Sequence, residues 1–322
     1  MSKYFIKRIL IIIPVFIGLS IIIFTLINIA SGDPYSNMLE SQISISAEDR
    51  ESALKAIGYY DPVYLKYTKW VGNILKGDMG ISIRYNEPVV DIIQRRISNT
   101  FLLSIITLIL TTSLAVPLGI ISASKQYSIQ DRLLTVFAFL GISVPGFFVA
   151  LVVVKIFAID MSIFPISGMS TVGYDLTGFD KFIDITKHMI LPVLSMTLVE
   201  VGSLLRYTRS AMLDVINQAY IRTARAKGIS EKMIIYKHAF RNALIPVITL
   251  INMSLGYIFA GTILIETIFV WPGMGTLFYQ AISNRDYPLV MACAMILSSC
   301  ILIANLISDI VYCLIDPRVR IK

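Results

Sequence analysis

Charged residues are scarce in this sequence, and so are cysteine and histidine. Only 15% of the 322 residues are Asp, Glu, Lys or Arg, whereas 56% are apolar. Soluble domains usually hold about 25% charged and about 45–50% apolar residues. The mean hydropathy of +0.75 points in the same direction. This composition excludes a disordered chain, a secreted disulfide scaffold and an ordinary cytosolic enzyme.

The few cysteines and histidines limit the chemistry that the chain can carry. The three cysteines, Cys293, Cys300 and Cys313, lie in or beside the last apolar stretch. We therefore expect no external disulfide and interpret them as small apolar side chains. The two histidines, His188 and His238, are predicted to lie on opposite faces of a membrane. They cannot share a metal ion, so no metal site is expected.

Several catalytic motifs are also absent from the sequence. There is no HExxH, CxxC or GxSxG pattern, so the interpretations as a membrane protease or a redox enzyme lack a catalytic constellation. There is also no GxxxxGK[ST] phosphate-binding loop. The chain is therefore not expected to be an enzyme, and any ATP that powers it must be hydrolysed by a partner.

Long apolar runs are what the sequence does contain. A membrane-spanning helix needs about 20 apolar residues to cross about 30 Å of hydrocarbon. Backbone polar groups in lipid must pair within their own segment, so such runs form helices. The prediction is an all-α integral membrane protein with six transmembrane helices at residues 9–30, 100–124, 133–159, 188–205, 243–265 and 287–308.

The distribution of charge orients these helices. With the amino terminus inside, the inner segments hold sixteen Lys and Arg against five Asp and Glu. The outer segments then hold eleven against fifteen. This is the positive-inside asymmetry, so both termini are predicted to be cytoplasmic. The net charge of +7 is thereby explained without a nucleic-acid partner.

The predicted topology divides the chain into four parts. Residues 1–30 form the cytoplasmic N-terminus and first helix, and residues 31–99 an extracytoplasmic subdomain. Residues 100–315 form a five-helix core, and residues 316–322 a cytoplasmic tail. Within 31–99, apolar and aromatic residues from Tyr64 to Ile74 recur at helical spacing, and a second helix from Asp91 leads into the next span. Residues 160–187 are predicted to be a loop.

The cytoplasmic loop at residues 206–242 is much longer than a turn requires and carries eight cations. We expect Asp214 to cap a helix that ends at Gly228, and Ser230 to start a second helix that continues into the fifth span. Small residues form one face of the first helix (Ala219, Thr223, Ala226), and polar ones form another (Gln218, Arg222, Arg225). These cations either set topology and contact anionic lipid headgroups, or belong to an element that docks on another protein.

Two charged residues lie inside the predicted spans, and one lies just beyond them. Glu200 is a candidate for the translocation pathway, although it could instead pair with Arg206. Lys155 can reach the membrane surface. Glu266 is interpreted as a solvated or capping residue rather than a substrate contact.

Two turn motifs complete the set of candidate residues. Ser143 and Pro145, within an SVPG sequence in mid-span, form the best candidate for a hinge along the pathway. Prolines are also frequent in membrane helices for other reasons. On the outer side, Trp271, Pro272, Gly273 and Gly275 form a tight turn, with the Trp expected at the level of the lipid headgroups.

Several stretches, taken together and in order, resemble one protein family. They are KR at 7–8, DP at 61–62 through GDMG at 77–80, YIRTARAKG at 220–228, HAFRNALIP at 238–246, IFVWPGMG at 268–275, and DPR at 316–318. The resemblance is to binding-protein-dependent ABC transporter permeases, and within them to the B-type membrane subunit of the dipeptide/oligopeptide/nickel group. Arg222-Thr223-Ala224 departs from the Glu-Ala-Ala of the broader family but is typical of this group.

The resemblance implies a function and a set of partners. Such a subunit forms a pore with a second homologous permease, is powered by two cytoplasmic ATPases that bind ATP and Mg, and receives its substrate from an extracytoplasmic solute-binding protein. It lies in the cell membrane of a prokaryote and holds no cofactor itself. The resemblance assigns coupling to the ATPases to Ala219, Tyr220, Arg222, Thr223, Ala224, Arg225, Ala226, Lys227 and Gly228.

The substrate implied is a di- or oligopeptide, and nickel or a metal chelate carried by the same machinery stays open. A self-contained secondary transporter is the alternative from another class. It would show charges in several spans or an internal inverted repeat. Because Lys155 can reach the membrane surface, Glu200 is the one charge deep within a predicted span, and the sequence shows no internal repeat.

Overall fold

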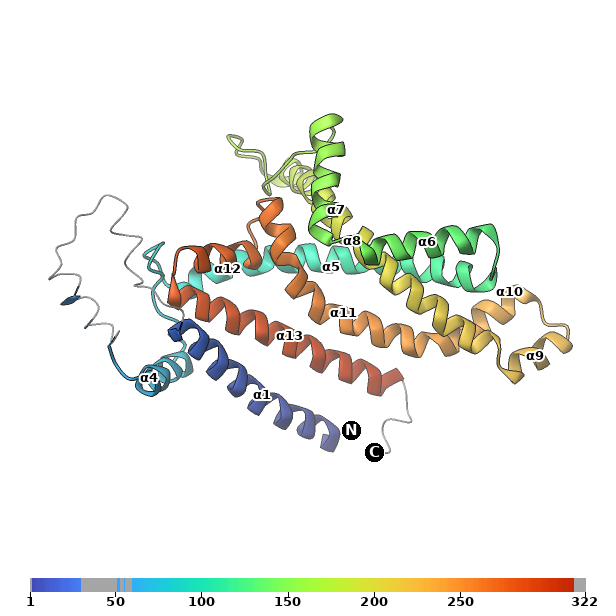
Figure 1. Ribbon diagram of the computed structural model, residues 1–322, viewed down its shortest axis with the longest axis horizontal. Coiled ribbons are helices and arrows are strands. Elements are labelled where there is room, and N and C mark those ends of the chain that lie inside the picture. The colour runs from blue at the N-terminus through green and yellow to red at the C-terminus, as the bar shows by residue number, and fades with distance from the viewer. Residues whose placement is uncertain (1, 30–50, 53–54, 56–59, 316–322) are drawn as a thin grey trace.

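The computed structural model describes residues 2–29, 51–52, 55 and 60–315, and this part of the chain is built of helices (Figure 1). Five helices are long and apolar enough to cross a membrane: α1 (Ser2–Ile29), α5 (Val89–Ser124), α8 (Gly178–Ile216), α11 (Phe240–Ile268) and α13 (Tyr287–Ile315). They contain the predicted first, second, fourth, fifth and sixth spans, which confirms those predictions. The predicted tail at 316–322 lies outside the described residues.

The third predicted span is not one continuous helix. It consists of α6 (Ile129–Ser143), α7 (Gly146–Val153) and a π-helical continuation, η1 (Val154–Asp160). The axis bends by 104° between α6 and α7, so the span predicted over 133–159 is broken at its predicted hinge. Pro145 disfavours helical dihedrals at Val144, which is extended with φ −90° and ψ 127°. The SVPG sequence therefore marks a sharp break, as its composition predicted.

α8 is longer at both ends than predicted. It begins at Gly178, so the predicted loop over 160–187 is confined to residues 161–177. It continues past Arg206 to Ile216, and Asp214 lies in its last turn rather than at the start of the next helix. The prediction that Asp214 is a helix cap is wrong, because Thr208 and Met212 keep one face of α8 buried beyond the first arginines.

The amphipathic helix predicted outside the first span is confirmed as α4 (Val63–Leu75). It lies against the outer end of α1, where the rings of Tyr67 and Trp70 are 5.3 and 5.8 Å from that of Phe24. Tyr67 Oη also lies 2.8 Å from Ser20 Oγ. The helix predicted from Asp91 is confirmed as the first turns of α5. Much of the predicted subdomain at 31–99 lies outside the described residues.

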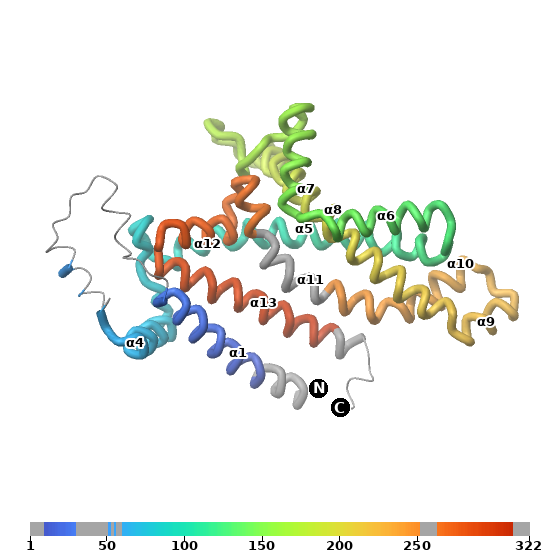
Figure 2. The backbone as a smooth tube through the Cα atoms, viewed as in Figure 1, coloured from blue at the N-terminus to red at the C-terminus, as the bar shows by residue number. Residues whose placement is uncertain are grey.

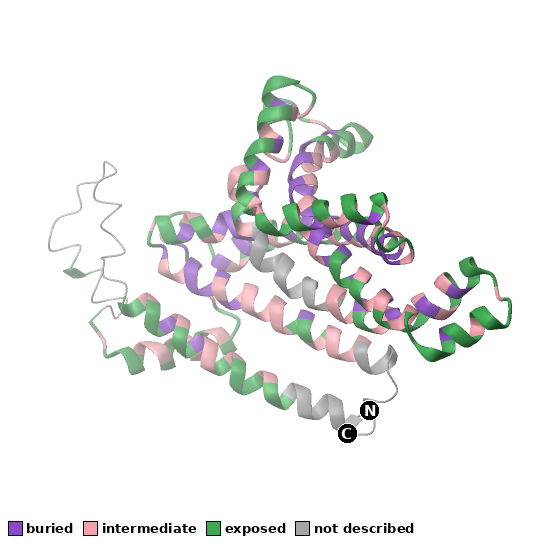
Figure 3. Ribbon diagram, turned by 45° about the vertical axis from the view of Figure 1, so that its right-hand side comes forward, coloured by how far each residue is buried: buried purple, intermediate pink, exposed green. Residues whose placement is uncertain are grey.

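The core lies between α5 and α8, which pack against each other (Figure 1). Buried residues, purple in Figure 3, gather where the helices meet. Close approach requires glycine at two positions. A Cβ on Gly119 of α5 would lie 2.6 Å from Thr208 Cβ, and one on Gly202 of α8 would lie 2.7 Å from the Ala138 carbonyl oxygen of α6. Small residues thus fix three helices against one another, as is usual in membrane bundles.

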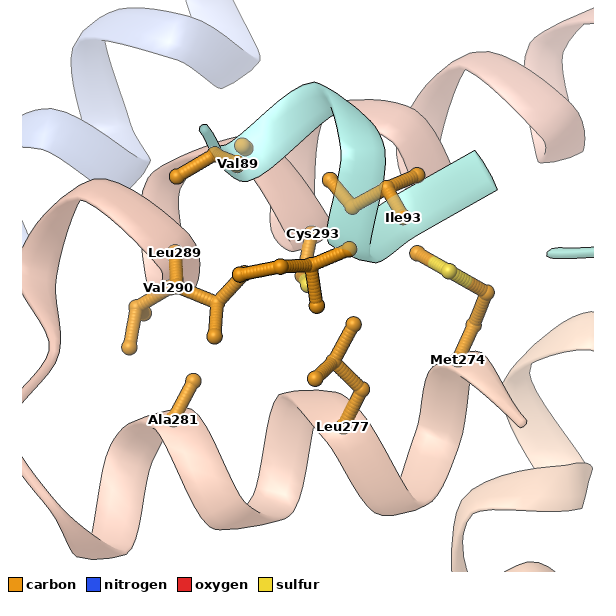
Figure 4. Packing of buried hydrophobic residues seen from close by; sticks show 10 residues of the cluster. Val89, Ile93, Met274, Leu277, Ala281, Leu289, Val290 and Cys293 are labelled. Atoms are coloured by element: carbon orange, nitrogen blue, oxygen red, sulfur yellow. The ribbon is translucent and has the colours of Figure 1, made fainter. Parts of the chain in front are cut away.

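A second cluster joins the outer ends of α5, α13 and the short helix α12 (Met274–Ser283) (Figure 4). Val89 and Ile93 of α5 meet Leu277 of α12 and Leu289 of α13. Cys293 is buried in the same cluster, which confirms its interpretation as a small apolar side chain.

Candidate functional site

The predicted coupling segment forms a compact turn of helices at the inner end of the bundle. α9 (Ala219–Ala226) follows α8 after two residues, Asn217 and Gln218. It is followed by α10 (Glu231–Met233) and a π-helical stretch, η2 (Ile234–Ala239), which runs directly into α11. The tube in Figure 2 shows this segment projecting at the end of the molecule opposite to α4 and α12.

One side chain anchors α9 to the bundle. Ile221 is fully buried, in a cluster with Met212 of α8 and Ile234, Ala239 and Ala243 from η2 and α11. The small-residue face that the sequence predicted is exposed at Ala219, Thr223 and Ala226, and so are the flanking cations. α9 is therefore held from one side and presents its opposite side to a partner.

The turn after α9 is formed as predicted. Gly228 has φ +75°, a left-handed conformation that disfavours other residues. Its N–H donates to the Arg225 carbonyl at 3.0 Å, and the Ile229 N–H donates to the Ala224 carbonyl at 3.3 Å. Ser230 then occupies the N-cap position of α10, as predicted, although its side chain makes no capping hydrogen bond there.

An ion pair joins the two sides of this turn. Arg225 Nη2 lies 2.6 Å from Glu231 Oε1, and Arg225 Nε lies 3.2 Å from Glu231 Oε2. Both side chains are about half exposed, so the free energy that the pair contributes to stability is small, about 0.2–1 kcal/mol. The contact fixes the orientation of α9 relative to α10 and partly neutralises one cation of the predicted polar face.

A buried ion pair that the sequence did not reveal lies close to this segment. Asp131 of α6 accepts hydrogen bonds from Arg209 Nε at 2.7 Å and Arg209 Nη2 at 2.9 Å. It also accepts from Ser122 Oγ of α5 and from the Tyr127 N–H. The inner ends of α5, α6 and α8 are thus fastened at one point, about two turns before α8 ends at Ile216.

Glu200, on α8, is half-buried and is not paired with Arg206. One of its carboxylate oxygens, Oε2, has no hydrogen-bond partner in the protein, and the same holds for Thr111 Oγ1 on α5. Three more buried hydroxyl groups on these two helices are also unsatisfied: those of Ser104, Thr112 and Thr197. Among the described residues, Glu200 forms no ion pair, and Arg206 instead lies against the Tyr207 ring.

The break in the third span lies beside this part of α8. A Cβ on Gly141 would lie 3.1 Å from the Leu198 carbonyl oxygen, and one on Gly146 would lie 3.8 Å from the Val199 side chain. Ser143 and Pro145 lie between these two glycines. The structure therefore brings the predicted hinge and the α8 turn before Glu200 together.

The tryptophan of the outer turn is not an exposed residue at the level of the lipid headgroups. Trp271 is completely buried, in a cluster with Leu103 of α5 and Val193 of α8. Its Nε1 donates to the Asn99 carbonyl at 3.1 Å, and the Asn99 amide donates to the Pro272 carbonyl at 2.8 Å. The prediction of a belt tryptophan is wrong, because this ring fills the core between α5 and α8.

Glu266 is likewise fully buried, so the expectation of a solvated carboxylate is wrong and that of a capping one is confirmed. It accepts from Thr100 Oγ1 at 2.7 Å and from the N–H groups of Gly275 and Thr276 at 2.7 and 3.1 Å. Those N–H groups are at the first turn of α12, where carboxylates are favoured. A Cβ at position 273 would overlap the Glu266 carboxylate, so the close approach of this carboxylate requires glycine there.

Another buried carboxylate holds the far end of α12. Asp286 accepts from the Leu289 N–H at 3.3 Å, from the Arg84 N–H at 3.1 Å and from Ser82 Oγ. It therefore caps α13 and ties the segment before α5 to the outer turn. Within the described residues, no cluster of three or more His, Cys, Asp or Glu side chains could hold a metal ion.

These features define an integral membrane protein with a tightly satisfied outer end and an exposed, anchored helix at its inner end. Residues 115–321 match the family described as "binding-protein-dependent transport system inner membrane component". The chain belongs to this family. It is a multi-pass inner-membrane permease subunit of an ABC transporter, and a self-contained secondary transporter is thereby excluded.

Individual relatives agree along the whole chain. The oligopeptide transport system permease protein AppB of Bacillus subtilis is 39% identical over 321 residues, covering 99% of this chain and all of the relative. The dipeptide transport system permease protein DppB of Escherichia coli K12 is 33% identical over 339 residues, with both chains fully covered.

A solved structure shares the fold. A chain of the MetNI methionine ABC transporter, described in inward-facing conformations, superposes with a TM-score of 0.54 at 13% identity. The match covers 70% of this chain and 97% of that chain.

Proposed function

We propose that this permease imports di- or oligopeptides, delivered by an extracytoplasmic binding protein, together with a second homologous permease and two ATPase subunits. The proposal is supported by relatives whose names specify oligopeptide or dipeptide transport and that align over the whole chain. ATP and Mg bind to the partner ATPases, and this subunit contributes the path and the mechanical connection. No nucleic acid takes part.

The single observation that carries the mechanism is that helix α9 is exposed, with Ile221 as its one fully buried side chain. Its exposed small residues allow close approach of another protein surface, and its exposed cations Arg222 and Lys227 flank that surface. In the proposed mechanism the ATPase groove receives the residues Ala219, Tyr220, Arg222, Thr223, Ala224, Arg225, Ala226, Lys227 and Gly228.

Movement of α9 would be transmitted through rigid contacts. Ile221 connects it to α8, η2 and α11, and the Arg225–Glu231 pair connects it to α10. The Asp131–Arg209 pair then connects α8 to α6. Closure of the ATPases would therefore displace α6, α8 and α11 together at their inner ends.

The proposed path for the substrate includes the hinge at Ser143 and Pro145 and the carboxylate of Glu200. A carboxylate in mid-membrane is a functional candidate, because it is otherwise costly. The sharp bend between α6 and α7 lies one turn from Glu200, so motion of the bend would change its surroundings. Trp271, Pro272, Gly273 and Gly275 have a different role in this proposal, which is to hold α12 rigid at the outer end.

The test uses the complete transporter, reconstituted in liposomes with its binding protein. Ala226→Trp adds a large side chain to the exposed face of α9, and we expect peptide uptake to fall at least tenfold, with loss of the ATPase subunits on purification. Gln126→Trp, at an exposed position in the turn between α5 and α6, is the matched control. Full uptake by the α9 variant would contradict the docking role of α9.

The substrate is tested separately. Dipeptides, longer peptides and Ni²⁺ are each titrated against the binding protein and then offered to the liposomes. Peptide-stimulated ATP hydrolysis without any response to Ni²⁺ is expected. A response to Ni²⁺ alone would contradict the peptide proposal and leave the role of α9 unaffected.

A further inference from the structure

A cleft of about 750 Å³ opens at the inner end of the bundle, between α5, α6 and the α10–η2 segment. Two of the elements that line it, the first turns of α6 and the start of α10, lie near each other in Figure 1. Its lining comes from three places: the last turns of α5 with the turn after it, the first turns of α6, and the start of the helix that follows α9. The lining residues are Leu118, Ile121, Ser124, Lys125, Gln130, Leu133, Leu134, Glu231, Lys232, Ile235 and Tyr236.

The cleft is apolar where it lies at bilayer depth. Leu118, Ile121, Leu133 and Leu134 lie inside the second and third predicted spans, and Ile235 continues the same surface on η2. Leu133 is 65% exposed. Hydrocarbon is the solvent that such a surface meets in a membrane, so its apolar part suits an acyl chain.

The cleft is cationic where it leaves the bilayer. Lys125 and Lys232 are both exposed, and among the described residues neither forms an ion pair. The one acidic lining residue, Glu231, is already paired with Arg225 at 2.6 Å. Gln130 and Tyr236 add hydrogen-bonding groups to the lining, whereas the Ser124 hydroxyl already donates to the Ile121 carbonyl at 3.0 Å. The rim therefore has two uncompensated positive charges over an apolar floor.

We propose that this cleft binds one anionic phospholipid, with its phosphate between Lys125 and Lys232 and an acyl chain along Leu118, Ile121 and Leu134. Basic pockets between membrane helices on the cytoplasmic side are suited to acidic lipid headgroups. The bound lipid would connect the turn between α5 and α6 to α10, which carries α9. The site is separate from the α9 face proposed to contact the ATPase, and it does not depend on which substrate is imported.

The experiment measures lipid retention by the complete transporter in mass spectra recorded from lipid nanodiscs. The nanodiscs contain phosphatidylglycerol and phosphatidylcholine in equal amounts. A lysine near an anionic lipid contributes about fivefold to binding, so Lys125→Ala with Lys232→Ala should weaken phosphatidylglycerol retention about 30-fold. Lys237→Ala is the control, because Lys237 is exposed on the same segment and does not line the cleft.

A second variant tests the apolar floor with both lysines kept. Ile121→Trp fills the cleft, and we expect it to displace the lipid as well. Free glycerol phosphate, offered in place of lipid, should not protect the site, because it lacks the acyl chain.

Three outcomes would overturn the proposal. The first is equal retention by the double variant and the Lys237→Ala control, and the second is displacement of the lipid by glycerol phosphate. The third is crosslinking of Gln130→Cys to an ATPase subunit rather than to a photoreactive lipid, which would show a protein surface in the cleft.

Discussion

The two ends of this permease use short helices in opposite ways. At the outer end, α12 begins at a turn whose tryptophan, glycines and neighbouring glutamate are all buried and hydrogen-bonded to one another. At the inner end, α9 is held by one buried side chain and one exposed ion pair, and the rest of it faces outward. A buried, satisfied turn fixes a structure, whereas an exposed helix on a narrow anchor suits a moving contact with a partner.

Removal of the outer tryptophan should have the largest effect on stability. Trp271→Ala leaves a cavity between α5 and α8, so we expect the free energy of unfolding to fall by about 3–5 kcal/mol. Chemical unfolding of the purified permease measures this free energy, with the circular dichroism of the helical backbone as a signal that does not depend on the tryptophan. Tyr279 of α12 is 53% exposed, so Tyr279→Ala is the control and should change stability by less than about 1 kcal/mol. Equal effects would contradict the claim that the buried Trp271 side chain stabilises the outer end.

The buried ion pair under the coupling segment should rank next. Asp131→Ala leaves Arg209 without its carboxylate, and we expect a loss of about 3 kcal/mol. Asp160→Ala removes the partner of Lys155 in an exposed pair at 2.8 Å and should cost less than about 1 kcal/mol. In a double-mutant cycle with Arg209→Ala, coupling near zero would contradict the role of this pair in joining α6 to α8.

A substitution at Gly228, the left-handed glycine after α9, should have a smaller effect on stability. Gly228→Ala forces a side chain into φ +75°, so we expect a loss of about 1–2 kcal/mol and weaker binding of ATPase subunits. Gly72→Ala, in the interior of α4 with open space around it, should instead raise stability by up to about 1 kcal/mol. Unchanged ATPase binding by the Gly228 variant would separate the turn from coupling.

The exposed ion pair should have the smallest effect on stability and a distinct effect on function. Arg225→Ala should cost less than about 1 kcal/mol, because both partners are about half exposed. Peptide-stimulated ATP hydrolysis is expected to fall with Arg225→Glu. If the arginine acts only through Glu231, the double variant Arg225→Glu with Glu231→Arg restores hydrolysis. If it contacts the ATPase directly, as we propose, the double variant does not restore it.

Much of this architecture could be predicted because it depends on local chemistry. Apolar runs of sufficient length gave five of the six spans, Gly228 gave the exit from α9, and the SVPG sequence gave the position of the break in the third span. The 104° bend could not be predicted, because its size depends on how α7 packs against α8.

The errors share a different physical cause, which is contact between residues far apart in the chain. The environment of Trp271 is set by Asn99, 172 residues earlier, and Asp131 meets Arg209 across 78 residues. Hydropathy places a tryptophan at an interface and a charged residue at a surface by default. The Asp131–Arg209 contact had one signal in the sequence. Asp131 and Arg209 carry opposite charges and lie at the inner ends of two predicted spans.

The most direct test of the central claim is site-specific crosslinking of α9 in the complete transporter, with Cys293, Cys300 and Cys313 replaced by Ala. Cysteine placed at the exposed Ala226 should crosslink to an ATPase subunit, and the yield should change when ATP is added. Cysteine placed at the exposed Tyr279 of α12 should give no such product. Absence of the product at Ala226 in an assembled, active transporter would contradict the proposed coupling through α9.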